Sequence, residues 1–162
     1  MKRKRKTAVI HCSGTSGREG ACSFGCTGCG ACRDACKKDA VRLTEQGAAW
    51  IDRELCVGCG LCRDACPQHI ISLVPAENPI QVLCANREPA KEARKRCAGS
   101  CVGCGTCERS CPAGAMRVTD NCAAVSQEVC NACGMCAVKC PRGAIFDARG
   151  ILTEWPPEAG PG

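Results

Sequence analysis

The sequence predicts an α+β fold made of two tandem copies of one small module, each containing short antiparallel β-hairpins and short helices. Three observations support this prediction. Cysteine motifs recur after 74 or 75 residues, short apolar runs follow each motif, and the 162 residues include 21 Cys but only 2% aromatic residues. A chain with so few large side chains cannot fill a core with them and needs covalent or metal staples.

The repeat is carried by four cysteine runs of the form C-x2-C-x2-C-x3-C. They are Cys26, Cys29, Cys32 and Cys36; Cys56, Cys59, Cys62 and Cys66; Cys101, Cys104, Cys107 and Cys111; and Cys130, Cys133, Cys136 and Cys140. The first run recurs as the third, and the second recurs as the fourth. Cys22 and Cys97 each lie four residues before a run, and Cys12 and Cys84 follow similar apolar segments. A duplication with a small insertion or deletion explains these correspondences.

The elements follow in the same order in both copies. Short strands are expected at residues 9–10, 41–43, 50–51 and 70–74, and again at 80–83, 115–118, 123–125 and 144–146, because these runs are apolar and bounded by turn residues. The first strand of each copy is expected to pair with its last. Single helical turns are expected at 60–66 and 134–140, and a basic surface helix at 88–97.

These elements divide the chain into four parts. We expect a basic tail at residues 1–6, one module at 7–77 (module 1), a second at 78–150 (module 2), and a flexible C-terminal tail at 151–162. Residues 75–79, which begin and end with proline, are the expected linker. The basic tail is read as a solvated segment, with an acidic redox partner or anionic lipid as the alternative.

The cysteines are expected to bind metal rather than form disulfides. The basic N-terminus is followed by only three apolar residues, Ala8 to Ile10, which is too short for the core of a signal peptide. No apolar run approaches the roughly 20 residues of a membrane span. We therefore expect a cytoplasmic protein, in which free thiols stay reduced, and an odd number of cysteines also argues against a disulfide framework.

The spacing of each run predicts a [4Fe-4S] cluster. Three thiolates separated by two residues can wrap around one face of a cubane, and C-x2-C-x2-C-x3-C-P is the bacterial ligand pattern for such clusters. Pro67, Pro112 and Pro141 follow three of the runs, whereas Lys37 follows the first. A zinc site would instead show two C-x2-C pairs separated by 12 or more residues. Four runs predict four [4Fe-4S] clusters.

The formal charge of +6 does not indicate a nucleic-acid partner. Sixteen ligating cysteines are thiolates, and four oxidised cluster cores carry about +2 each, so the loaded protein has a net charge of about −2. An electrostatic argument must include the charge of the metal. We expect redox proteins as partners and no nucleic acid.

The four runs resemble those of the bacterial-type 2[4Fe-4S] ferredoxins, across residues 7–74 and again across 79–150. This resemblance implies that the fourth cysteine of each run serves the neighbouring cluster. The implied ligand sets are Cys26, Cys29, Cys32 and Cys66; Cys56, Cys59, Cys62 and Cys36; Cys101, Cys104, Cys107 and Cys140; and Cys130, Cys133, Cys136 and Cys111.

A narrower resemblance covers about residues 8–150. The strings ACSFGCTGCGACRDACKKDAV and VLCANREPAKEARKRCAGSCVGCGTCERSCPAGAM are similar to the ferredoxin-rich part of the B subunit of Rnf-type complexes, which exchange electrons between ferredoxin and NAD. The resemblance implies ferredoxin, a flavoprotein or Rnf-type subunits as partners and peripheral association with the membrane. The sequence shows neither that subunit's N-terminal membrane anchor nor its separate N-terminal cysteine cluster, so a free-standing soluble ferredoxin is the alternative.

No side chains form a recognisable catalytic site. There is no dinucleotide-binding or phosphate-binding loop and no Ser/His/Asp set, so the protein is expected to be an electron carrier within an oxidoreductase rather than a complete enzyme. Cys12, Cys22, Cys84, Cys97 and Cys122 are read as small buried side chains, with Cys22 as an alternative cluster ligand. His11 and His69 are read as structural or surface residues.

Overall fold

The computed structural model describes residues 4–12, 22–44, 47–97 and 99–153, which form four two-stranded antiparallel sheets and five short helices. The sheets pair β1 (Lys6–Ile10) with β4 (Ile71–Pro75), β2 (Val41–Leu43) with β3 (Ala49–Ile51), β5 (Ile80–Val82) with β8 (Ile145–Asp147), and β6 (Met116–Thr119) with β7 (Cys122–Val125). The helices are α1 (Ala31–Ala35), α2 (Leu61–Ala65), α3 (Ala90–Arg96), α4 (Thr106–Ser110) and α5 (Met135–Lys139). The α+β prediction is confirmed.

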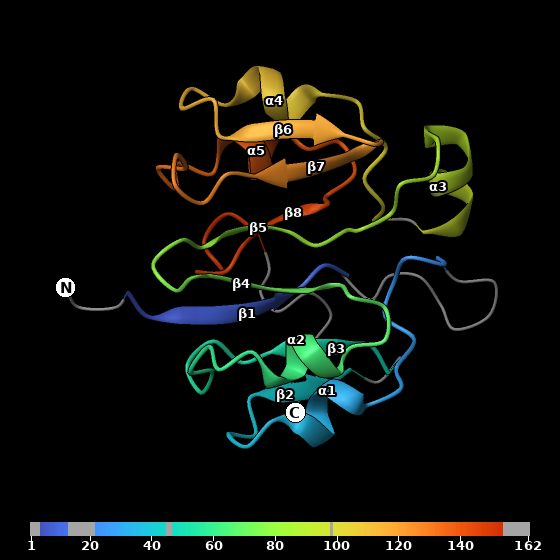
Figure 1. Cartoon of the computed structure of the whole chain (residues 1–162). Coiled ribbons are helices and arrows are strands. Elements are labelled where there is room, and N and C mark those ends of the chain that lie inside the picture. Colours follow the sequence, from blue (N-terminus) through green and yellow to red (C-terminus); the bar gives the residue numbers. More distant parts are fainter. Residues whose placement is uncertain (1–3, 13–21, 45–46, 98, 154–162) are drawn as a thin grey trace.

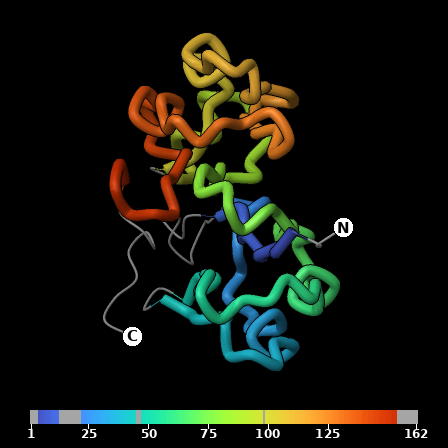
Figure 2. The backbone as a smooth tube through the Cα atoms, turned by 90° about the vertical axis from the view of Figure 1, so that its left-hand side faces the viewer, coloured from blue at the N-terminus to red at the C-terminus, as the bar shows by residue number. Residues whose placement is uncertain are grey.

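The two copies of the repeat lie one above the other (Figure 1). The β1–β4 and β5–β8 sheets lie in the middle of the molecule. The β2–β3 hairpin with α1 and α2 forms one end, and the β6–β7 hairpin with α4 and α5 forms the other; Figure 2 shows the same two lobes from the side. Val9, Val74 and Leu83 are buried together between the central sheets, with Phe146 packed against them.

The predicted pairing of the first strand of each copy with its last is confirmed. Ile10 lies opposite Ile71 in the β1–β4 sheet, and Val82 lies opposite Ile145 in the β5–β8 sheet. In both sheets the inward-facing partners are β-branched and apolar, which favours a pleated, half-buried surface. The pairing closes each copy of the repeat on itself.

Four of the helices are single turns with identical boundaries relative to the cysteine runs. Each begins after a glycine in the left-handed conformation, with φ between 76° and 85°, and each ends at the fourth cysteine of its run, where the chain becomes extended; the glycines are Gly30, Gly60, Gly105 and Gly134. The turns expected at 60–66 and 134–140 are confirmed as α2 and α5. The equivalent α1 and α4 were not predicted. The expected basic helix is confirmed as α3.

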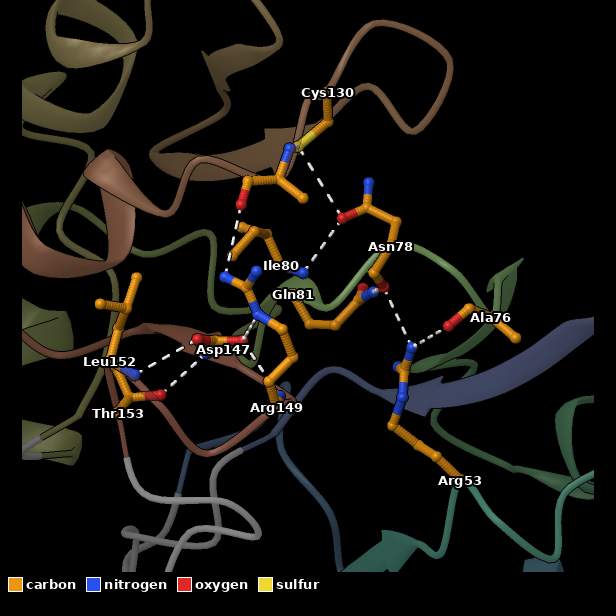
Figure 3. Close-up of polar contacts among 11 residues, drawn as sticks. Arg53, Ala76, Asn78, Ile80, Gln81, Cys130, Asp147, Arg149, Leu152 and Thr153 are labelled. Atoms are coloured by element: carbon orange, nitrogen blue, oxygen red, sulfur yellow. Dashed lines mark hydrogen bonds and ion pairs between the residues drawn. The ribbon is translucent and has the colours of Figure 1, made fainter.

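The segment between β4 and β5 is held by side chains from both copies of the repeat (Figure 3). Arg53 Nη2 donates to the carbonyl oxygens of Ala76, at 3.1 Å, and of Asn78, at 3.0 Å. Asn78 Oδ1 accepts the Ile80 N–H at 3.1 Å and lies 3.8 Å from the Sγ of Cys130. This linker is therefore fixed by hydrogen bonds at the centre of the molecule, beside a cysteine of the fourth run.

Polar contacts also anchor the segment that follows β8. The buried Asp147 carboxylate accepts hydrogen bonds from Arg149 Nε, at 2.8 Å, and from the Leu152 N–H, at 3.3 Å (Figure 3). Burial of Asp147 disfavours its charged form, but these donors hold the pKa of the carboxyl below its usual value. Of the predicted C-terminal tail, residues 154–162 lie outside the described residues.

Gly58 gives the first testable prediction. Its φ is +69°, and a Cβ at this position would lie 2.5 Å from the main-chain oxygen of Lys6 in β1. Gly143 has a similar φ of +63° but nothing within 4 Å of the same position. Gly143→Ala should cost about 1–2 kcal/mol for the left-handed backbone. Gly58→Ala should cost about 1–3 kcal/mol more, because β1 must move.

The two variants are compared by the temperature at which the anaerobic protein loses its visible cluster absorption. The larger decrease is expected for Gly58→Ala. Equal decreases in the two variants would show that the close approach of Gly58 to β1 is unimportant.

Candidate metal centres

Three cavities are each lined by four cysteines, and none of these sets comes from a single run. The first cavity is lined by Cys26, Cys29, Cys32 and Cys66. The second is lined by Cys36, Cys56, Cys59 and Cys62, and the third by Cys101, Cys104, Cys107 and Cys140. The three cavities are similar in size, with empty volumes, open solvent included, of about 350, 340 and 320 Å³.

The fourth set is brought together by the same construction. The Cys136 thiol lies close enough to Cys130 and Cys111 for their charges to affect it, and Cys111 and Cys130 pack against the core that contains Cys136. Cys133 is the exposed member of this run. The structure thus places the fourth cysteine of the third run beside the fourth run, as it does for the other sets.

The helical turns explain why the fourth cysteine leaves its own run. The third cysteine of each run lies inside the helix, whereas the fourth ends it; for example, Cys32 lies in α1 and Cys36 has φ −82° and ψ 115°. Because α1 packs beside α2, and α4 beside α5, an extended residue at the end of one helix reaches the run on its neighbour. Cys36 therefore lines the cavity of the second run, and Cys66 lines the cavity of the first run.

Buried main-chain N–H groups point at the cysteine sulfurs. Ala8 donates to Cys56 at 3.3 Å, and Ala123 donates to Cys101 at 3.3 Å. The fourth cysteine of three runs also accepts a hydrogen bond from the main-chain N–H four residues later. The pairs are Ala40 with Cys36 at 3.4 Å, Ala115 with Cys111 at 3.2 Å, and Ala144 with Cys140 at 3.4 Å. Such hydrogen bonds stabilise thiolates and tune the potential of a bound cluster. Sequence reasoning did not single out these alanines, because main-chain donors leave no side-chain signature.

The cavities suit a positively charged group. Burial, together with the charges of the neighbouring Cys26, Cys66 and Cys29, raises the pKa of Cys32 to about 11. Burial likewise raises the pKa of Cys107 and of Cys136 to about 11. Four thiolates in an apolar cavity repel one another and lose hydration, so they require metal cations to stay ionised. The donor set and the cavity both fit an iron–sulfur cubane.

The cysteines of a set stand around a space rather than meeting at one point. Among the described residues, no three His, Cys, Asp or Glu side chains are grouped closely enough to hold a single metal ion. In a cubane each thiolate binds a different iron.

One cysteine of each run faces solvent. The second cysteines, Cys29, Cys59, Cys104 and Cys133, are exposed, whereas the third cysteine of each run is buried. Each set therefore has one exposed cysteine, with the others half-buried or buried.

Cys122 lies between two other thiols. Its thiol lies within hydrogen-bonding reach of the Cys84 and Cys101 sulfurs, and this contact lowers the pKa of Cys84 to about 7 and of Cys101 to about 6. Cys122 has its own pKa raised by the same two partners, so it remains a protonated donor. Cys122 was predicted to be a small buried thiol, and its burial is confirmed. Its contact with Cys101, a predicted ligand, was missed, because module 1 has no cysteine at the position equivalent to Cys122.

The two histidines differ in their surroundings. The His11 ring bridges the Val82 carbonyl oxygen, at 2.8 Å, and Ser72 Oγ, at 2.7 Å, and burial lowers its pKa. His69 is exposed and has a left-handed φ of 54°. The prediction that both histidines are structural or surface residues agrees with these positions.

Comparison with known families gives three matches. A 4Fe-4S dicluster domain matches residues 25–71, a second 4Fe-4S dicluster domain matches residues 55–115, and a 4Fe-4S binding domain matches residues 123–146. The second match pairs the second run with the third, whereas the cavities pair the first with the second and the third with the fourth. The runs are so alike that sequence matching alone does not fix their pairing.

Three curated relatives are B subunits of ion-translocating redox complexes. The chain is 38% identical over 125 residues to the B subunit of the Na(+)-translocating ferredoxin:NAD(+) oxidoreductase complex of Acetobacterium woodii, covering 77% of this chain and 36% of the relative. It is 38% identical to the B subunit of the ion-translocating oxidoreductase complex of Methanosarcina acetivorans, covering 77% and 46%. It is 44% identical to the B subunit of the proton-translocating ferredoxin:NAD(+) oxidoreductase complex of Clostridium ljungdahlii, covering 68% and 39%. The chain thus spans less than half the length of these relatives.

Among solved structures, the formate dehydrogenase–heterodisulfide reductase–formylmethanofuran dehydrogenase complex from Methanospirillum hungatei contains a chain with 21% identity and a TM-score of 0.29. The match covers 76% of this chain and 52% of that one. In the part of the chain that the structure describes, no helix has the length and apolar character needed to cross a membrane.

Proposed function

This chain belongs to the 4Fe-4S ferredoxin-type proteins and is homologous to the B subunits of ion-translocating ferredoxin:NAD oxidoreductase complexes, and we propose that it relays single electrons through four [4Fe-4S] clusters to redox protein partners. The observation that carries the proposal is the convergence of cysteines from two runs on each of three similar cavities. Bound [4Fe-4S] clusters supply reversible one-electron chemistry. The chain supplies ligands, spacing and surroundings.

We assign the ligands to four sets, each made of three cysteines from one run and the fourth cysteine of the neighbouring run. The sets are Cys26, Cys29, Cys32 and Cys66; Cys56, Cys59, Cys62 and Cys36; Cys101, Cys104, Cys107 and Cys140; and Cys130, Cys133, Cys136 and Cys111. The cavities support the first three sets, and the neighbours of Cys136 support the fourth. The pairing within residues 7–77 and within 78–150 supports the division into module 1 and module 2.

Electron exchange with partners is proposed to occur at two equivalent faces. Leu55, Val57 and Leu61, close to Cys59 in the sequence, are exposed, and the Cys59 side chain also faces solvent. Val129, Met135 and Val138, close to Cys133 in the sequence, are exposed in the same way. Exposed apolar groups are typical of surfaces that dock other proteins. A redox protein bound there lies against the solvent-facing edge of a ligand set.

The partners follow from the relatives. We propose that the chain works with ferredoxin, a flavoprotein or the other subunits of an Rnf-type complex, in the cytoplasm or at the inner face of the membrane. A free-standing ferredoxin that serves other redox enzymes is the alternative. Pull-down of the anaerobic protein from its own cells distinguishes these two assignments by the subunits recovered.

The function is tested by mixing reduced protein anaerobically with an oxidised small ferredoxin. We expect rapid reoxidation of the protein and no NADH formation from NAD by the isolated chain. Leu61→Glu combined with Met135→Glu should slow the exchange without loss of iron, because charge is placed on both docking faces. Ile151→Glu changes an exposed apolar residue outside the cysteine runs and serves as the control. Turnover of NAD without a partner, or no exchange at all, would contradict the proposal.

A further inference from the structure

Four cysteines outside the ligand sets occupy equivalent places in the two modules. Cys12 and Cys84 each lie two residues after the end of the first strand of their module, β1 and β5. Cys22 and Cys97 each lie four residues before the first ligand of a run, Cys26 and Cys101. The described structure contains all four, two from each module, and we refer to them as the interface cysteines.

The interface cysteines approach one another across the module boundary. The Cys22 thiol is close enough to Cys84 and Cys97, both from module 2, for their charges to act on it, and with burial as the main cause its pKa is raised. The Sγ of Cys12 and the Cβ of Cys22 lie 3.4 and 3.6 Å from the point where a Cβ on Gly25 would stand. Cys22 therefore has Cys12 on one side and two thiols of the other module nearby.

The ends of β1 and β5 are held together beside these thiols. His11, which precedes Cys12, donates a hydrogen bond from its ring Nδ1–H to the Val82 carbonyl oxygen, at 2.8 Å, and Val82 is the last residue of β5. Cys12 and Leu83 line one small cavity, and Cys12 packs against the same core as Ala85. The segments that carry Cys12 and Cys84 are thus fixed side by side.

Two of the four interface cysteines, Cys84 and Cys22, have main-chain donors at their sulfurs, as the ligand sulfurs do. Cys84 Sγ accepts main-chain N–H groups from Asn86, at 3.4 Å, and from Cys101, at 3.3 Å. Two predicted ligands also accept from the N–H two residues later: Cys26 from Gly28 and Cys130 from Ala132, both at 3.4 Å. The main chain of Phe24 makes the same bond to Cys22. Main-chain donors of this kind favour the thiolate form of a cysteine.

We propose that Cys12, Cys22, Cys84 and Cys97 ligate a fifth [4Fe-4S] cluster at the interface between the two modules. Four thiolates are the donor set that such a cluster takes. The site adjoins one ligand set in each module, since Cys22 is four residues from Cys26 and the Cys101 N–H donates to Cys84. If the four-cluster relay is correct, this cluster connects its two halves.

The proposal is tested by counting iron and acid-labile sulfide in the anaerobically purified full chain. Five cubanes contain about 20 of each, whereas four contain about 16. The double variant Cys84→Ala and Cys97→Ala should contain about 16. Cys122→Ala removes a buried thiol that contacts Cys84 but is not one of the interface cysteines, and it should keep about 20.

The wild-type count decides the question even if a variant fails to fold. About 16 irons and 16 sulfides in the wild type would overturn the fifth cluster while leaving the proposed relay intact. Sixteen irons with one zinc, the zinc being lost in the double variant, would also overturn it and would identify the interface cysteines as a zinc site. Protein without labile sulfide would instead contradict the relay itself.

Discussion

Cys66→Ala should remove the cluster bound by Cys26, Cys29 and Cys32, although Cys66 lies in another run. The reason is that Cys66 lines the same cavity as those three residues, beyond the end of α2. The cluster on Cys56, Cys59 and Cys62 should survive, because the cavity that they line is completed by Cys36. The variant should contain about four irons fewer than the wild type.

The sites are identified by alkylation under anaerobic conditions, followed by mass spectrometry of the peptides. In the full chain, replacing Cys26, Cys29 and Cys32 with Ala should free Cys66 for alkylation while Cys36 stays protected. Cys140→Ala is the matched control, because Cys140 is the counterpart of Cys66 in module 2; it should free Cys101, Cys104 and Cys107 instead. If Cys36 becomes reactive and Cys66 stays blocked, each run holds its own cluster and the pairing across runs is wrong.

Removal of iron should unfold the whole protein, which is the second large effect that we expect. The buried core of module 1 includes Cys32, Cys56 and Cys62, and the buried core of module 2 includes Cys107 and Cys136. Without iron these side chains enclose cavities instead of a packed centre, and metal binding supplies the folding free energy. Chelation should therefore abolish the strand and helix signals in circular dichroism together.

The matched control is the same chelator treatment stopped before iron is lost, which should leave the spectrum unchanged. A cooperative thermal transition in iron-free protein, with native circular dichroism at low temperature, would contradict this expectation. It would mean that Ile80, Met116, Ile145 and the other buried apolar side chains fold the chain unaided.

Much of the fold could be predicted because the cysteine runs and the short apolar segments occur twice in the sequence. The strands after each run and the pairing of β1 with β4 and of β5 with β8 follow from short apolar segments at equivalent positions. The helices α1 and α4 were missed, although α2 and α5 were predicted from the same motif. A five-residue turn has no hydrophobic periodicity, so only the left-handed glycine before it marks its start.

The candidate sites could be predicted in part. Spacing predicted sixteen cysteines as ligands, and the resemblance to ferredoxins implied how the runs are paired. Two features could be found only from the three-dimensional structure. The first is the approach of Cys22 to Cys84 and Cys97, which lie more than 60 residues away in sequence. The second is the contact of Cys122 with Cys101, because Cys122 has no counterpart in the other copy.

The central claim, that the cysteine runs hold [4Fe-4S] clusters for electron transfer, is tested most directly by the metal and sulfide content of the anaerobic wild-type protein. We expect at least about 16 irons per chain, matched one to one by acid-labile sulfide, and visible absorption that bleaches on reduction with dithionite. Stoichiometric zinc without labile sulfide would contradict the account.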